Sequence, residues 1–303
     1  MSRIVLETVP NVSEGRDEQR VEDIGRAFAT HGCRLLDVHT DASHNRSVFT
    51  LVGDPQEIAD TVIAGARIAV DRIDMRTHDG AHPCIGALDV VPIVYLTEAD
   101  RANARDEALA VANRLAAELE LPVFGYGELA TAPERRERSY FREGGIDALA
   151  ERMREGELAP DFGPVRMHPT AGATLVAARP PLVAFNIELD TAEVEVARSI
   201  AAVVRERDGG LPGVRAIGIA LGPGENCQVS TNVQDPFRVP LAEVIEAVRR
   251  EAGERGTSVS CAELVGLAPA GALEGFPEDI EIRGFEERRH VLEHAIGRHT
   301  PHD

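Results

Sequence analysis

The chain has 303 residues, of which 43% are hydrophobic and 27% charged, and its formal net charge is −19. This composition excludes an extended disordered chain and is that of a folded protein, long enough for one large domain or two smaller ones. The acidic excess argues against a nucleic-acid partner, because phosphates must be met by a basic face.

The sequence carries no signal for a membrane or for export. No apolar run approaches the roughly 18 residues that cross a bilayer, and the first residues lack an apolar core with a cleavage site. All the basic side chains are arginines, which excludes lysine Schiff-base chemistry. The cysteines are scattered without CxxC spacing, so neither a disulfide framework nor a zinc knuckle is expected. We therefore expect a cytoplasmic protein without membrane contacts.

Strands and helices alternate through the first half of the chain. Apolar residues at helical spacing predict a helix at 17–31, and Asp54-Pro55 opens another at 56–71, since proline is favoured in the first turn. The other expected elements are strands at 3–9, 33–38, 46–52, 87–96 and 122–126, a helix at 98–120, and a partly helical stretch at 133–153 broken by Gly144-Gly145.

The second half repeats this general order after a change of composition at 159–178, which is rich in Gly, Pro, Thr and Ala. The expected elements are strands at 181–189, 214–221, 228–233 and 258–265, helices at 191–207 and 240–254, and a polar tail at 290–303. We predict an α/β (α+β) fold of two subdomains, 1–178 and 179–300, each a β-sheet backed by helices. Too few βα units are present for an eightfold barrel.

The segment 77–86 is the strongest candidate for a functional site. It crowds histidines, aspartates and glycines directly before a buried strand, and loops this polar commonly contact ligands. Pro83 restrains the backbone of His82. An imidazole titrates near neutral pH and can accept and return a proton, so His82 is the candidate acid–base residue.

Two other interpretations of this segment remain open. It can be an ordinary polar surface loop. It can also belong to a metal site with His39, His44, His78 and His82 as ligands, as in a metal-dependent hydrolase. Gly80 and Pro83 prevent the helix that would aim both loop histidines at one ion, so we expect no metal.

Two further polar segments accompany this loop. One begins at His39, after the strand 33–38 that Asp37 closes, and leads through Asn45 to Arg46, which can bind a carboxylate in bidentate fashion or remain an exposed cation. The other, at 163–172, is rich in Gly and Pro and adds positive charge, so it can approach a flat ligand closely. Composition alone favours a linker between domains for this stretch.

Together these segments resemble the formiminotransferase family. The resemblance runs in order through nearly the whole chain, which makes the set far more specific than any single motif. Its pieces are Pro10-Asn-Val-Ser-Glu-Gly-Arg, Leu35-Leu-Asp-Val, Asn45-Arg-Ser-Val-Phe-Thr, Ile73-Asp-Met, His78-x-Gly-x-His82-Pro, Ile85-Gly-Ala-Leu-Asp-Val-Val-Pro, Leu121-Pro-Val-Phe-Gly-Tyr-Gly-Glu, Pro160-Asp-Phe-Gly-Pro, Leu182-Val-Ala-Phe-Asn-Ile-Glu-Leu, Gln228-Val-Ser-Thr-Asn and Glu263-Leu-Val-Gly-Leu.

The resemblance implies two α/β subdomains whose sheets face each other around a tunnel for tetrahydrofolate. It implies transfer of the formimidoyl group of N-formimidoyl-L-glutamate to N5 of tetrahydrofolate, in histidine degradation and one-carbon metabolism, by a homodimer without a metal. The catalytic residue of the family falls on His82. Its folate loop falls on Gly163, Pro164, Val165, Arg166, Met167, His168, Pro169, Thr170, Ala171 and Gly172. The candidates for holding the glutamate substrate are Asp37, His39, Asn45, Arg46, Arg76, His78, Arg166 and Arg179.

Some positions depart from the family pattern. An acidic residue is expected where His39 stands, Glu and Arg where Ala81 and Cys84 flank the His-Pro pair, Trp where Ala171 stands, and a basic residue at Pro180. Because a carboxylate at position 39 would keep an amidine protonated, these changes suggest another donor, such as N-formylglutamate. The alternative from another class is a non-catalytic folate-binding protein of the same fold.

Overall fold

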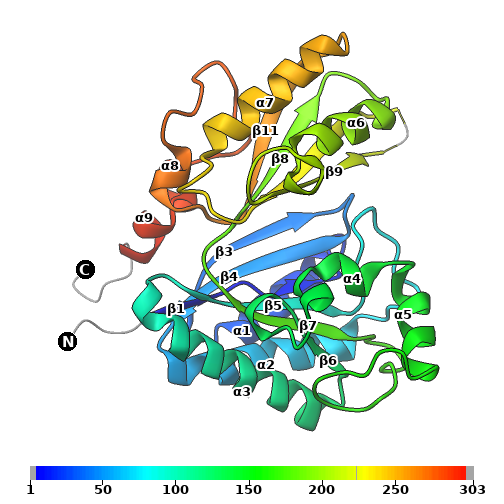
Figure 1. Ribbon diagram of the computed structural model, residues 1–303. Helices are drawn as coiled ribbons and strands as arrows, with labels where there is room; N and C mark the ends of the chain where they lie inside the picture. Colours follow the sequence, from blue (N-terminus) through cyan, green and yellow to red (C-terminus); the bar gives the residue numbers. More distant parts are fainter. Residues whose placement is uncertain (1–4, 223, 298–303) are drawn as a thin grey trace. The chain divides into compact units, whose positions relative to one another are not determined.

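The computed structural model describes residues 5–222 and 224–297. The chain divides between Pro180 and Pro181 into two compact units, called here the N-terminal and the C-terminal unit and described one at a time (Figure 1). In the described residues no helix is long and apolar enough to cross a membrane.

The N-terminal unit is built on a seven-stranded sheet. β1 (Leu6–Thr8) and β2 (Asn11–Val12) share one position, because both pair with β4 (Arg46–Gly53) and β5 (Leu88–Tyr95). The two strands are separated at Pro10, which has no amide hydrogen to give the sheet. β3 (Arg34–Asp41) is antiparallel to β4 at one edge. At the other side of β5, β7 (Thr174–Arg179) and β6 (Val123–Gly125) continue the sheet in parallel.

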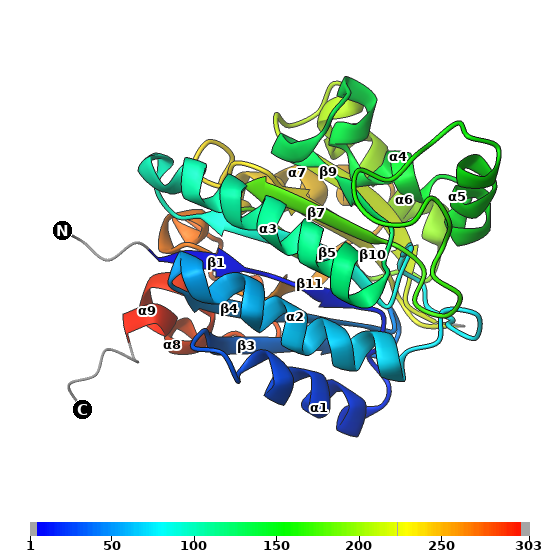
Figure 2. The same ribbon diagram turned by 90° about the horizontal axis from the view of Figure 1, so that it is seen from below.

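Three helices lie side by side across one face of this sheet: α1 (Glu18–Phe28), α2 (Pro55–Arg72) and α3 (Arg101–Leu119) (Figure 2). Their starts follow from the sequence, because Asp17 accepts the amide of Arg20 and Asp54 forms a capping box at the first turn of α2. The main core lies between these helices and the sheet.

The opposite face is covered over its parallel half by α4 (Arg138–Arg142) and α5 (Gly145–Arg154). Phe141, Leu149 and Met153 from these helices are buried against Phe124 of β6 and Leu175 of β7. The other half of this face carries polar side chains of β1, β3 and β4, since alternate residues of a strand point to opposite faces. The candidate site described below is built on this half.

The C-terminal unit is a four-stranded antiparallel sheet in the order β11 (Val259–Val265), β8 (Val183–Leu189), β10 (Cys227–Val233) and β9 (Val214–Ala220). Helices α6 (Val194–Val204) and α7 (Leu241–Glu254) bury their apolar sides against one face. Two short helices follow, α8 (Glu287–His290) and α9 (Leu292–Gly297). The 3-10 helices among the described residues are η1 (Glu98–Asp100), η2 (Gly127–Leu129), η3 (Pro133–Arg136), η4 (Glu206–Asp208) and η5 (Ala270–Leu273).

Both units contain the same order of elements. In the N-terminal unit β1/β2, α1, β3, β4, α2 and β5 form a βαββαβ unit, and in the C-terminal unit β8, α6, β9, β10, α7 and β11 do the same. The first strand of each unit lies inside its sheet, between the third and the fourth. The repeated order expected from the sequence is therefore confirmed, and the mixed α/β class with helix-backed sheets is confirmed with it.

Three expectations about local structure were wrong. β3 runs on to Asp41 because it pairs with β4 as far as the Asp41–Arg46 pair, so His39 lies in a strand and not in a loop. The segment 163–172 is no linker, since Gly172 pairs with Gly86 and the strand β7 that follows lies inside the sheet. Part of the expected tail is helical and buries Leu292 and Ala295; residues 298–303 lie outside the described range.

Candidate functional site

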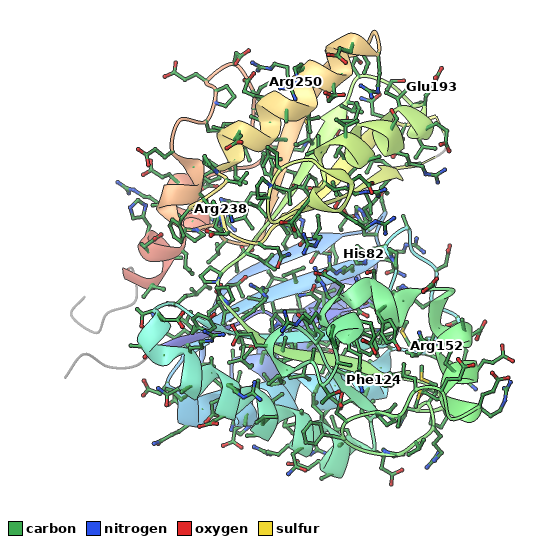
Figure 3. All side chains as sticks on the ribbon, viewed as in Figure 1. His82, Phe124, Arg152, Glu193, Arg238 and Arg250 are labelled. Carbon is green, nitrogen blue, oxygen red and sulfur yellow. The ribbon has the colours of Figure 1, made fainter. Side chains whose placement is uncertain are left out.

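The loop that contains His82 is fastened to the turn between β3 and β4. The amide of Ala81 donates a hydrogen bond of 3.1 Å to the carbonyl of Ser43 in that turn. Gly80 permits this approach, because a Cβ there would lie 2.4 Å from the carbonyl oxygen of His44. His82 is thereby held at the end of the β3–β4 hairpin (Figure 3).

Asn45 joins three segments at this point. Its backbone has a φ of 49°, a left-handed conformation that asparagine tolerates better than most residues. Its side-chain oxygen accepts the amide of Gly15 at 3.0 Å, and its amide donates to the carbonyl of Asp79 at 2.9 Å. The same amide lies 3.3 Å from Nδ1 of His78. Asn45 therefore fixes the framework of the site, with His78 beside it.

The half-buried His82 lies among positive charges. Burial lowers the pKa of His82 well below 6.5, and Arg46, Arg142, Arg138 and His44 lower this pKa further. Its Nδ1 is buried and has no hydrogen-bond partner within the described structure. A neutral imidazole in this setting is a base that can accept a proton from a bound ligand.

Arg46 comes from β4 and lies on the sheet face opposite α1–α3. Burial lowers the pKa of Arg46 to about 9, and the neighbouring cations Arg142 and Arg138 contribute while Asp89 opposes them. Its Nε is buried without a partner in the described part of the chain. A guanidinium nitrogen that is buried without a partner is costly unless an anion meets it, so this position favours a negatively charged ligand.

Arg138 and Arg142 reach the same region from α4. Arg142 donates to Oδ2 of Asp89, whose Oδ1 accepts the amide of Ile85 at 2.8 Å. Only 1% of Asp89 is exposed. This carboxylate balances one of three neighbouring guanidinium groups, so the cluster keeps an excess of positive charge in an acidic chain.

The line of buried charges continues along the sheet to β7 and β1. Arg138 lies with its Cζ 6.0 Å from the centre of the Tyr126 ring. Burial lowers the pKa of Arg179 at the end of β7, although Tyr126 and Glu7 oppose the effect. Burial raises the pKa of Glu7 to about 7 despite the attraction of Arg179. We call Arg46, Arg138, Arg142 and Arg179 the arginine cluster.

His44 lies beside His82. The centroids of the two rings are 6.0 Å apart, with their planes at 66°. Nδ1 of His44 shares a hydrogen bond with Oδ2 of Asp41, and its backbone amide donates to Oδ1 of Asp41 at 2.8 Å. Burial alone would raise the pKa of Asp41, but these contacts with His44 outweigh it and lower the pKa to about 2.

The segment 163–172 packs beside the His82 loop. His168 and Gly172 exchange backbone hydrogen bonds of 3.1 and 3.3 Å, which closes the segment into a small hairpin. Thr170 accepts the amide of Met75 at 2.8 Å, and Gly172 pairs with Gly86. The two segments that the sequence singled out are therefore neighbours in one unit.

The other predicted residues divide into two groups. In β3, Asp37 pairs with Thr50 of β4 and His39 pairs with Val48 of β4. Both lie on the sheet face that carries Arg46. Outside the cluster, Arg76 is held by the carboxylate of Asp74, through hydrogen bonds that include one of 2.9 Å from its Nε. Arg166 is exposed and lies 3.7 Å from Glu120.

The candidate metal ligands were His39, His44, His78 and His82. The part of the chain that the structure describes has no group of three or more His, Cys, Asp and Glu side chains arranged to hold an ion. His44 is hydrogen-bonded to Asp41, and Nδ1 of His78 lies beside the amide of Asn45. The arrangement instead suits proton transfer beside a bound anion.

Sequence reasoning missed the residues that complete the site. They are Glu7, Asp41, Asp89, Arg138 and Arg142. The signal for Asp89 was present, since a carboxylate inside an apolar strand must have a partner. Nothing in the local pattern distinguished the two arginines of α4 from other arginines of an exposed helix.

Comparisons with known protein families match both units of the chain. A family model described as the formiminotransferase domain, N-terminal subdomain, matches residues 5–179, and one described as the formiminotransferase domain matches residues 184–276. The chain is 39% identical over 296 residues to a glutamate formimidoyltransferase of Streptococcus pyogenes serotype M1, covering 97% of this chain and 99% of that protein.

Two further relatives give the same result. A glutamate formimidoyltransferase of Thermoplasma acidophilum is 36% identical, covering 93% of this chain and 94% of that protein. A formimidoyltransferase-cyclodeaminase of Rattus norvegicus is 42% identical over 90% of this chain, which spans only 51% of that longer protein. From the two family models and these identities, the chain belongs to the formiminotransferase family.

Proposed function

We propose that this protein transfers the formimidoyl group of N-formimidoyl-L-glutamate to N5 of tetrahydrofolate, with His82 as the proton carrier. The observation that carries the proposal is the arginine cluster beside His82, in a chain that belongs to the formiminotransferase family and is acidic elsewhere. The names of the relatives that match most of their own length support the same reaction.

Each part of the site has a place in this reaction. The folate nitrogen attacks the amidine carbon, and His82 takes the proton that this nitrogen loses. The bond to the glutamate nitrogen then breaks, and the proton returns to that leaving nitrogen. The dicarboxylate donor needs cations, and Arg46, Arg138, Arg142 and Arg179 offer guanidinium groups suited to carboxylates.

The segment 163–172 is proposed to contact the folate. Its hairpin is fixed beside the His82 loop, and the exposed Val165 lies within it. The proposed homodimer is tested separately, by light scattering during size-exclusion chromatography.

The test supplies tetrahydrofolate with N-formimidoyl-L-glutamate or with N-formyl-L-glutamate and follows the folate spectrum. Turnover with the first donor is expected. Turnover with the second alone would keep the transferase but change its donor. Folate binding without turnover would favour the non-catalytic alternative.

A matched pair of variants tests the role of His82. His82→Ala should lower kcat by about 100-fold or more without changing the folding transition. His31→Gln is the control, because this histidine is exposed and lies just beyond α1, outside the strand β3 that carries site residues. Full activity of His82→Ala would remove His82 from the mechanism.

A further inference from the structure

Asp41 and His44 form a fixed pair at the end of the β3–β4 hairpin. Both carboxylate oxygens of Asp41 engage His44, one through the backbone amide at 2.8 Å and the other through Nδ1 of the ring. Only 6% of His44 is exposed. The ring is therefore held with Nδ1 toward the carboxylate, and its other nitrogen points away from Asp41.

The pair contacts the proposed base through the neighbouring ring. The His44 and His82 rings are 6.0 Å apart between centroids, and the edge of one meets the face of the other. The hydrogen bond from Ala81 to Ser43 ties the two backbones together, so this proximity is built into the loop geometry. At this separation a proton would cross between the rings through one bridging water.

We propose that Asp41 and His44 are positioning residues that relay the proton of the transfer reaction through His82. His82 accepts the proton lost from the folate nitrogen as the new carbon–nitrogen bond forms, and passes it to His44. When the bond to the glutamate nitrogen breaks, the proton returns through His82 to that nitrogen, so no proton or electron is gained overall. This inference rests on the proposed function.

The charges around the two rings explain why such a relay is useful. His82 faces Arg46, Arg138 and Arg142, which repel a proton on its ring. His44 faces the carboxylate of Asp41, which stabilises a positive ring by hydrogen bonding and by charge. The two rings therefore meet opposite charges, guanidinium groups around His82 and a carboxylate beside His44. The same logic underlies a histidine oriented by a carboxylate in hydrolytic triads.

The first experiment compares steady-state kinetics of five variants with the wild type. His44→Gln should lower kcat by about 100-fold and Asp41→Asn by about 10-fold, each with little change in KM, since neither residue is proposed to bind substrate. The double variant His44→Gln/His82→Ala should be no slower than His82→Ala alone, because the residues act as one unit. His31→Gln is the control for a histidine outside the relay.

The second measurement tests the hydrogen bond between Asp41 and His44 without turnover. Nitrogen NMR of the histidine rings should show Nδ1 of His44 protonated in the wild type, and this signal should change in Asp41→Asn and not in His31→Gln. Circular dichroism establishes that each variant is folded. A merely structural pair would lower stability and leave kcat of the folded fraction unchanged.

The outcomes separate the two proposals. An active wild type whose His44→Gln variant keeps its kcat within about twofold overturns the relay and leaves the proposed function standing. Additive losses in the double variant also overturn the relay, since two independent residues add their effects. A wild type without turnover overturns the proposed function, and the relay with it.

Discussion

Arg142 and Asp89 form a buried ion pair whose carboxylate also accepts the backbone amide of Ile85, at 2.8 Å. The pair links α4 to the end of the His82 loop, so it holds the arginine cluster next to the proposed base. Removing one partner leaves a buried charge without compensation, which costs more than the pair itself contributes.

Asp89→Asn is therefore expected to destabilise the protein by about 3 kcal/mol and to lower activity by releasing Arg142. Denaturant unfolding with linear extrapolation measures the first effect, and kcat/KM measures the second. Asp74→Asn is the matched control, since its carboxylate pairs with the exposed Arg76 at the surface and should leave the midpoint unchanged. An unchanged midpoint in Asp89→Asn would show that the buried pair is not structurally important.

The pH dependence of the reaction should report the charges around His82. Its pKa lies well below 6.5, so the ring is neutral and competent as a base throughout the neutral range. In Arg46→Gln a repelling cation is gone, so the pKa of His82 should rise and the acid limb of kcat/KM should move to higher pH. KM for the glutamate donor should rise as well. Arg114→Gln, on the outer side of α3, is the control and should change neither the acid limb of kcat/KM nor the KM for the donor. An acid limb that stays in place in Arg46→Gln would show that His82 is not the group that produces it.

Gly86 should tolerate no side chain. An added Cβ would lie 1.9 Å from the carbonyl oxygen of Ala173, where β7 begins. Gly86→Ala is expected to cost about 2–3 kcal/mol and to displace the segment 163–172, weakening folate binding. Gly253→Ala gives the opposite sign, because this glycine lies in α7 with nothing within 4 Å of an added Cβ, and alanine favours a helix. The thermal unfolding midpoints of both variants measure these effects. Equal midpoints would contradict the close approach of Gly86 to the carbonyl of Ala173.

Glu7 should make the protein less stable as pH rises. Burial raises its pKa from 4.5 to about 7, so between these values the folded state binds a proton that the unfolded state has lost. Stability from this group is fully present below pH 4.5 and is lost as pH rises through 7, by up to about 3 kcal/mol. Glu7→Gln should flatten this part of the curve, measured by denaturant unfolding at pH 5 and pH 8. If the difference in unfolding free energy between the wild type and Glu7→Gln is the same at pH 5 and at pH 8, the raised pKa of Glu7 is contradicted.

The sequence was informative wherever local pattern and burial coincide. The helical periodicity of α2 and α7 and the apolar run of β5 predicted these elements closely, and the glycine-rich and polar segments marked both loops of the site. β7 was missed, because its small residues read as part of a linker. Its parallel pairing with β5 is a long-range contact that no local pattern reveals.

The candidate site was predictable only in part, for a related reason. His82 and Arg46 lie in distinctive motifs, so the sequence alone named them. Arg138 and Arg142 sit on a short polar helix, and their role depends on which strand α4 packs against. Arg76 shows the converse: an arginine beside the motif is bound by its neighbour Asp74.

The placement of β7 has a consequence for how the N-terminal unit folds. Its pairing of Val90 with Leu175 closes a loop that contains α3, β6, α4 and α5, so it is a contact of high sequence separation. Such contacts form slowly, because the entropy of closing a long loop is lost before any pairing is gained. The arginines of α4 and the segment 163–172 both belong to that loop. The first βαββαβ layer depends on a contact of similar separation, since Leu6 of β1 pairs with Tyr95 of β5. Both parts of the N-terminal unit therefore need long-range pairing before the arginines and the segment 163–172 come together on one sheet.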